Sequence, residues 1–554
     1  MYKRLPLILF VLILLLGFFL RFWNLDSIPS GFHIDEVANA YLGRYVIENG
    51  KDIYDNVWPI FAIDKKGDFP PVLPMYVAGF STKIFGNNMW ATRAPFALFG
   101  VLIVVVTYFC AIKIFDRKKY LALSSMFVAA IMPWQVGFSR IGAEGVMAGL
   151  FFLIGLYFIL KFLDKSRRYA NLFIASFFGL FTYILYPSYR VTVPFSFFLI
   201  GIIQIVKSKN NLKDRKAYVL LIVSILFFVI SFAVSRTDWG ASRFAQTSWV
   251  GAYQNGQNPW QKYSMQDGNI LTARIFNSKL IFFATSFISE YFRYFSPDFL
   301  FLSEAKPVWF AIPRIGLLDL SLFVFLIISL LVLIRDSKNK VVQERMILLF
   351  GLLVVAPFGS ALTSEHTPNA HRSMQMAYLL PFVVPYFLLF INENYKKYFH
   401  YFMVLFVSLL LLETIWFSYN MFVEWSMNSA VYRDDGLFQA AQVAAKSSNK
   451  YNRIFMFNSG WYSLYYLFAS NNYSSKLIGQ FAPEFQIKNI DNVYFYRMEC
   501  PQDTWQISHQ SKGKEALFVQ KDCKLDKMKP APKFVENIKG SDPRFENMAL
   551  YELQ

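Results

Sequence analysis

The chain has 554 residues, of which 55% are hydrophobic and only 17% are charged. Soluble domains carry roughly a quarter charged residues, so this composition excludes an ordinary soluble protein. The formal net charge is +18. However, the basic residues gather in short loops between long apolar runs, which indicates membrane topology rather than a nucleic-acid partner. Contact with anionic lipid headgroups is a second use for this charge.

The first apolar run, residues 5–20, follows Lys3 and Arg4. It is too long for a typical signal-peptide core and no small-residue cleavage site follows it, so we expect a retained helix whose amino end is cytoplasmic. The apolar runs together give about eleven spans by the length criterion. They are expected at residues 5–20, 94–114, 121–132 (extending to about 137), 146–160, 172–186, 191–206, 218–234, 317–334, 346–362, 376–391 and 401–417.

The loops between these runs differ in charge. Short basic loops such as "KFLDKSRR" and "NENYKK" alternate with loops that carry Asp, Glu, His and Pro. The positive-inside bias therefore orients the chain in the plasma membrane. An odd number of spans places the carboxyl terminus outside the cell, together with the long segments 21–93 and 235–316.

The first outer loop contains "HIDEVANAYLGRYVIENG", whose apolar spacing predicts an amphipathic helix on the outer membrane surface. Two interpretations of its acidic pair stay open. In the first, Asp35 is a helix N-cap and the helix dipole favours Glu36. In the second, one carboxylate faces a cavity, where it accepts a proton or helps to hold a divalent cation.

Other polar side chains are expected on the same side of the membrane. Arg140 and Glu144 are four residues apart and share one face if their turn is helical. Taken singly, each outer arginine is a snorkelling anchor or a headgroup contact. Together, the clustered charges indicate a functional site. The candidates in these loops are Asp68, Arg93, Arg140, Glu144, Arg190, Glu365, His366, His371 and Arg372.

The composition changes near residue 419, where Lys, Asn, Asp, Gln and Ser become more frequent. We expect two domains, a membrane domain over residues 1–419 and an extracytoplasmic α/β domain over residues 420–554. In the second, "RIFMF" and "NVYFY" predict strands, while "GLFQAAQVAAKS" and "WYSLYYLFAS" predict helices. Cys500 and Cys523 both fall in this domain, where a disulfide survives if they pair; the sequence leaves the pairing open.

These parts suit sugar transfer from a lipid-phosphate donor at the outer interface. Arginines stabilise a leaving phosphate through bidentate contacts, and a carboxylate serves as base for an acceptor hydroxyl. The cytoplasmic loops are too short for a nucleotide-binding domain, so no nucleotide cofactor is expected. No histidine spacing resembles a zinc motif, whereas the carboxylates of Asp35 and Glu144 suit a divalent cation such as Mg or Mn.

Several segments resemble the polytopic GT-C glycosyltransferases, specifically the branch related to protein O-mannosyltransferases and aminoarabinose-lipid A transferases. The segments are "HIDEVANAYLGRYVIENG", "FPPVLPMYV", "ATRAPFALFGVLIVVVTYF", "PWQVGFSRIGAEG", "LYPSYRVTVP", "YFRYFSPDFLF" followed by "GLLDL", and "ALTSEHTPNAHRS". The resemblance implies an α-helical polytopic membrane protein with surface helices in its first outer loop. It also implies inverting transfer of a sugar from a polyprenyl-phosphate donor to an extracytoplasmic protein, glycan or lipid.

The resemblance further implies roles for single residues. The family's first acidic motif corresponds to Asp35 and Glu36, the expected catalytic carboxylates. Its second acidic position falls on Glu144, where many members carry Asp. Phosphate or substrate contacts are expected from Arg140, Arg190, His371 and Arg372, with Asp68 and Arg93 beside them.

Two other functions fit the same architecture. A polytopic sugar or lipid transporter or flippase is the main alternative. However, the spans carry almost no ionisable residue except Glu413, and transporters usually have broken helices at the midplane. A membrane scaffold whose tail binds envelope partners is the third hypothesis. Accumulation of substrate in vesicles without covalent transfer would favour the transporter or flippase. A phenotype that the tail alone produces would favour the scaffold.

Overall fold

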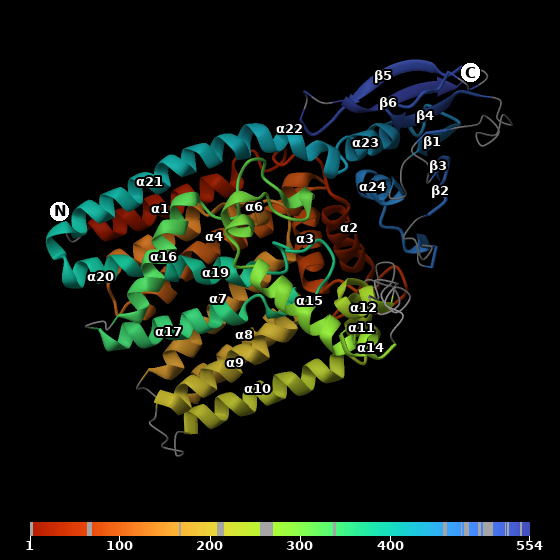
Figure 1. Ribbon diagram of the computed structural model, residues 1–554. Coiled ribbons are helices and arrows are strands. Elements are labelled where there is room, and N and C mark those ends of the chain that lie inside the picture. The colour runs from red at the N-terminus through yellow and green to blue at the C-terminus, as the bar shows by residue number, and fades with distance from the viewer. Residues whose placement is uncertain are drawn as a thin grey trace. The chain divides into compact units, whose positions relative to one another are not determined.

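Figure 1 shows the computed structural model of the chain, which divides into two compact units. The helical unit contains Met1–Trp23, Phe96–Ser139 and Ala143–Asn420, and the mixed unit contains Asn24–Pro95, Arg140–Gly142 and Met421–Gln554. Residues 24–95 therefore group with the carboxyl-terminal segment, while the predicted domain boundary after residue 419 stays a prediction. The structure describes all residues except 1–3, 64–68, 165–167, 208–214, 255–269, 277, 336–338, 458–461, 478, 481–486, 497–499, 502–512, 527, 529, 530, 543, 545 and 554.

The helical unit is built from apolar helices joined by short turns. Within it α7 packs against α8, α9 against α10, and α1 against α5. Its helices are α1 (Leu5–Phe22), α4 (Met89–Ile114, which starts in the mixed unit), α5 (Lys119–Ile131), α6 (Pro133–Ser139), α7 (Glu144–Leu163), α8 (Tyr169–Leu185), α9 (Tyr189–Lys207), α10 (Arg215–Val234), α11 (Asp238–Thr247), α12 (Trp249–Gln254), α14 (Ile270–Phe276), α15 (Lys279–Arg293), η1 (Asp298–Leu302), η2 (Val308–Phe310), α16 (Leu320–Ile334), α17 (Lys340–Val355), α18 (Phe358–Ala361), α19 (Met374–Val383), α20 (Tyr386–Asn394), η3 (Lys396–Tyr398) and α21 (Phe399–Tyr419).

The described ranges contain eight helices that are long and apolar enough to cross a membrane, or nine if the bent pair α5–α6 counts as one span. Two further predicted runs coincide with the shorter apolar helices α8 and α16, of 17 and 15 residues. Each of the apolar runs expected from the sequence therefore falls on a helix. The predicted polytopic helical architecture is confirmed.

A buried arginine donates hydrogen bonds to the backbone carbonyls at the break between α5 and α6. Pro133 lacks an N–H and cannot extend α5, so the two helices meet at 52°. This leaves carbonyls at the end of α5 without helical donors. Arg21 of α1 is fully buried and donates to Ala130 O at 2.8 Å and Ala129 O at 3.0 Å. The predicted single run thus becomes two helices whose junction is held by a third.

The mixed unit combines the helices of the first loop with a sheet. Its elements are α2 (Ile34–Asn49), α3 (Val72–Phe85), η4 (Asn420–Glu424), α22 (Trp425–Ser429), η5 (Ala430–Tyr432), α23 (Leu437–Ser447), β1 (Arg453–Phe457), α24 (Tyr462–Ala469), η6 (Ser475–Leu477), β2 (Asn489–Ile490), β3 (Val493–Tyr496), β4 (Glu515–Gln520), β5 (Lys533–Lys539) and β6 (Glu546–Leu553). The two strands and two helices predicted from the tail sequence are all present. Helix α2 packs against α3 and α24.

The sheet has six strands in the order β2-β3-β1-β4-β6-β5. Strand β1 pairs in parallel with β3 and β4, with Phe455 opposite Tyr494 and Leu517. The outer strands pair antiparallel. Because β1 and β4 are covered on both faces, nearly all their residues are buried, as expected for central parallel strands.

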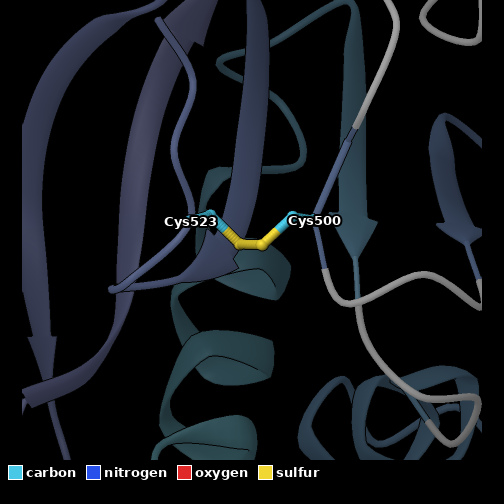
Figure 2. The surroundings of a disulfide bond; sticks show 2 residues. All are labelled: Cys500 and Cys523. Carbon is cyan, nitrogen blue, oxygen red and sulfur yellow. A yellow bond between two sulfur atoms is a disulfide. The ribbon is translucent and has the colours of Figure 1, made fainter.

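A disulfide joins Cys500 to Cys523, which answers the pairing that the sequence left open (Figure 2). The two cysteines are 23 residues apart in sequence, and both contact a core that includes Phe455, Phe457 and Leu517. The bond ties the chain after β3 to the chain after β4, so it constrains the strands beside β1.

Replacing both cysteines by alanine is expected to destabilise the sheet by about 2–4 kcal/mol, because an open loop of this size leaves the unfolded chain more entropy. Thermal unfolding of the detergent-purified protein, followed by tryptophan fluorescence, measures the change. The matched control is Cys110→Ala, a buried free cysteine of the helical unit. An unchanged midpoint in the double variant, with and without reductant, would contradict a stabilising bond.

Candidate functional site

The amino terminus of α2 carries the acidic pair in a capping box. Helix α2 begins at Ile34, and His33 is its N-cap. The Nδ1 atom of His33 accepts the backbone N–H of Asp35 at 3.3 Å, and Glu36 Oε2 accepts the N–H of His33 at 3.2 Å. The interpretation of Asp35 as N-cap is therefore wrong, because a histidine with an acceptor nitrogen occupies that position two residues earlier than expected.

Glu36 is buried in an ion-pair cluster. Its side chain is 3% exposed, and Arg93 Nε donates to Oε1 at 2.7 Å. Arg433, also fully buried, donates to Oε2. Arg93 also donates from Nη2 to Glu36 Oε2 at 3.2 Å, and from Nη1 and Nη2 to the carbonyls of Leu25, Pro29 and Gly31 at 2.6–3.1 Å. The two arginines compensate the negative charge of Glu36, which would otherwise be costly to bury. Because Arg93 also binds the carbonyls of residues 25, 29 and 31, this cluster stabilises the loop before α2.

Asp35 has the opposite environment. Its side chain is 61% exposed, and one carboxylate oxygen lies 3.4 Å from His33 Nδ1. Burial lowers the pKa of His33, an effect that the Asp35 carboxylate opposes. A neutral His33 keeps the Nδ1 lone pair that the Asp35 N–H uses. The two neighbouring carboxylates therefore differ: that of Glu36 is buried in ion pairs, and that of Asp35 is exposed at the amino end of α2.

In the helical unit, two predicted site segments meet at the start of α7. Glu144 is the first residue of this helix. The next residue, Gly145, donates its N–H to His371 Nε2 at 3.2 Å. Because that nitrogen accepts, the neutral His371 ring carries its proton on Nδ1. His371 is buried and packs against Tyr186, with ring centroids 4.5 Å apart and ring planes tilted by 46°. The loop of His371 and the end of α8 therefore converge beside Glu144.

A tyrosine completes this arrangement. Tyr378 of α19 donates its hydroxyl to Gly145 O at 3.1 Å. Its ring lies against Gly149, where a Cβ would come within 2.0 Å of the ring. Only glycine allows this approach, so the small residues in "AEGVMAG" bring α19 close to α7. Both backbone groups of Gly145, the residue after Glu144, are thereby hydrogen-bonded to side chains of other segments.

The remaining predicted arginines contact other parts of the chain. Arg190 lies over the Trp239 ring at 4.2 Å. Arg372 pairs with Glu365 at 2.9 Å. Their phosphate contacts, and those of His371, stay predictions.

Arg140 is not on a shared helical face with Glu144, because residues 140–142 form a turn before α7. Its buried guanidinium donates to Ile28 O at 2.9 Å, a contact that holds the first outer loop. The predicted phosphate contact of Arg140 is untested. Asp68 lies outside the described residues.

The predicted cation site is not assembled by the described parts of either unit. Within them, no three His, Cys, Asp or Glu side chains are grouped to hold a metal ion. Asp35 and Glu144 belong to different units. Binding of a divalent cation such as Mg or Mn, which takes several oxygen ligands, stays a prediction.

Three residues with roles at the α2 terminus escaped prediction, namely Arg433, Asp434 and Tyr465. They lie in the tail, for which the sequence suggests no family. The signal that points to them is the charged run "RDDG" directly before the apolar helix α23, since charges beside a buried helix start usually have partners.

One family model matches part of this chain. Residues 68–233, less than half of the chain, match the family model of dolichyl-phosphate-mannose-protein mannosyltransferases. No curated protein matches the sequence significantly.

The solved structures extend the similarity. ArnT from Cupriavidus metallidurans, bound to undecaprenyl phosphate, aligns with a TM-score of 0.51 and 11% identity over 99% of this chain and 98% of that chain. The oligosaccharyltransferase AglB from Archaeoglobus fulgidus, in complex with an inhibitory peptide and a dolichol-phosphate, aligns with a TM-score of 0.50 and 14% identity over 85% of this chain. This chain spans only 64% of the AglB chain. The alignments confirm the predicted GT-C-like fold with a small carboxyl-terminal sheet domain.

Proposed function

We propose that this chain, a membrane glycosyltransferase of the GT-C superfamily by its fold and its family match, moves one sugar from a polyprenyl-phosphate donor to an acceptor outside the cytoplasm. The donor class is supported by two neighbours of similar fold, one bound to undecaprenyl phosphate and the other to a dolichol-phosphate. The observation in this chain that carries the proposal is the exposed carboxylate of Asp35 at a helix end whose neighbour, Glu36, is locked.

Asp35 is the base in this proposal. Its carboxylate takes the proton of the acceptor hydroxyl, whose oxygen then bonds to the anomeric carbon of the donor sugar. The bond from that carbon to the phosphate oxygen breaks, and the lipid phosphate leaves with the bonding electron pair. Attack opposite the leaving group inverts the anomeric centre. A base held on a rigid helix end contributes most when its position is fixed before the substrate arrives.

Glu144 and the phosphate contacts belong to the helical unit in this proposal. Glu144 stands at the amino end of α7, which His371 and Tyr378 hold from the loop and from α19. Arg190 and Arg372 supply positive charge for the leaving phosphate. The step needs no metal ion as written, and a divalent cation on Asp35 and Glu144 stays a hypothesis that chelation of the purified protein tests.

The orientation is also part of the proposal. We place the amino terminus in the cytoplasm and the sheet domain outside. Two features support this, namely the basic loops between spans and the Cys500–Cys523 disulfide, which persists only in an oxidising compartment.

Glu413, the exception among the spans, has a structural partner and gives little support to the transporter alternative. Glu413, the ionisable residue of the last span, accepts the N–H and the hydroxyl of Ser321 at 2.8 and 2.5 Å. It therefore caps the start of α16 rather than marking an ion path. A broken span such as α5–α6 is a feature of many transporters. Here the carbonyls at the break accept hydrogen bonds from Arg21.

The purified protein in lipid nanodiscs is expected to release undecaprenyl phosphate from undecaprenyl-phosphate-mannose when an envelope extract is supplied as acceptor. No release of nucleotide is expected from GDP-mannose, because no nucleotide-binding domain is predicted in the cytoplasmic loops. Mass spectrometry of lipid products gives the rate, and other polyprenyl-phosphate sugars are tested in parallel. Accumulation of sugar inside vesicles without new covalent products would instead establish the transporter.

A further inference from the structure

The residues that lead into α2 are held from outside their own segment. Tyr465 of α24 donates its hydroxyl to Phe32 O at 2.5 Å and to Asp434 Oδ2 at 3.2 Å. Both Phe32 and Tyr465 are fully buried. Phe32 immediately precedes the N-cap His33, so this hydrogen bond acts one residue before α2 begins.

A second contact joins Gly31 to the backbone of Arg433. Gly31 has φ +83°, and a Cβ there would lie 2.4 Å from Arg433 O. This left-handed conformation and the close carbonyl both require glycine. The N–H of Gly31 donates to Ser541 Oγ at 2.7 Å, so the tail encloses this turn on both sides.

A third set of contacts fixes Ser30. Its hydroxyl lies 2.8 Å from the hydroxyl of Ser426, and Ser429 donates to Ser30 O at 3.1 Å. Ser30 is fully buried. Together with the Glu36–Arg433 ion pair, residues 30, 31, 32 and 36 are all bonded to the segment after residue 421.

These contacts decide how firmly Asp35 is held. Residues 30–32 are not helical, so no helical hydrogen bonds of their own fix them. Burial raises the pKa of Tyr465 well above its usual value, so its hydroxyl remains a donor across the physiological range.

We propose that the carboxyl-terminal segment is a positioning element for the transfer reaction, with Tyr465 and Arg433 as its positioning residues. They act through the turn of residues 30–33 and through Glu36 to aim the Asp35 carboxylate at the acceptor hydroxyl. The proposal rests on the proposed role of Asp35 as base. It gives the sheet domain a function inside the reaction, in addition to any contact with an acceptor.

Tyr465→Phe tests the proposal, because it removes the hydroxyl and keeps the buried ring. The matched control is Tyr462→Phe in the same helix, whose hydroxyl contacts Met548 of the sheet at 3.5 Å and not the first loop. With undecaprenyl-phosphate-mannose as donor, Tyr465→Phe is expected to lower kcat by about 10–100-fold, since small displacements of a catalytic group have effects of this size. KM for the donor and the rate of Tyr462→Phe should stay within about twofold of wild type.

A double variant separates positioning from a general loss of structure. If Tyr465 acts through Asp35, adding Tyr465→Phe to Asp35→Asn leaves the residual rate unchanged, because the two changes remove one shared contribution. An equal fold-loss in both backgrounds would refute the positioning role.

Hydrogen exchange of the amides at residues 34–37 provides a readout that does not depend on activity. Tyr465→Phe is expected to speed this exchange, and Tyr462→Phe is not. Equal exchange in both variants overturns the proposal. Faster exchange together with full turnover in Asp35→Asn would overturn the role of Asp35, and with it the catalytic part of this inference, while the anchoring contact would stand.

Discussion

Asp35→Asn is expected to lower turnover of a polyprenyl-phosphate sugar by about 10²–10⁴-fold, the usual contribution of a general base. The substitution preserves size and keeps hydrogen bonding, but an amide cannot take the acceptor's proton. The side chain is exposed, so thermal stability should stay near that of wild type. The rate of undecaprenyl phosphate release from nanodisc-embedded protein measures the effect, with donor binding measured separately.

Asp26→Asn is the control for this result. Asp26 is an exposed carboxylate in the same loop but lies outside α2, so its turnover should equal that of wild type. Asp35→Glu should recover part of the rate, because it restores the base at a displaced position. Full turnover in Asp35→Asn would exclude Asp35 as the base and leave Glu144 as the remaining predicted carboxylate.

Glu36→Gln is expected to destabilise the protein by about 3–5 kcal/mol, the range for breaking a buried ion pair by removing one partner. Arg93 and Arg433 would then share a buried site without a negative charge. The substitution should lower the unfolding midpoint in detergent and reduce the yield of folded protein. The activity of Glu36→Gln should fall in proportion to the amount of folded enzyme. The activity of Asp35→Asn should instead fall although the enzyme remains folded.

Glu48→Gln is the matched control, because Glu48 lies on the same helix and pairs with Arg44 and Lys83 at the surface, at 3.5 and 3.6 Å. Surface pairs contribute up to about 1 kcal/mol, so its midpoint should change little. The double variant Glu36→Gln/Arg433→Met removes one of the two uncompensated charges and should recover part of the stability. Equal midpoints in Glu36→Gln and Glu48→Gln would show that the buried cluster does not stabilise the fold.

Local pattern was sufficient to predict the helices. A run of apolar residues long enough to cross the hydrocarbon layer forms a helix because lipid offers the backbone no other hydrogen-bond partners. Short apolar and aromatic runs in the tail likewise predicted the strands β1 and β3, and longer segments predicted the helices α23 and α24. One run that local pattern predicted as a single span is interrupted at Pro133, where the missing N–H ends α5 and a distant arginine stabilises the break.

The sequence by itself determined the membrane architecture, the helix behind the acidic pair and the side chains from which a site can be built. Only the tertiary structure decided that Glu36 is buried in ion pairs and that Asp35 is exposed. The two arginines that bury Glu36 lie 57 and 397 residues away in sequence. A charge is buried only where its partners reach it through space, and residue spacing near Glu36 carries no information about partners so distant.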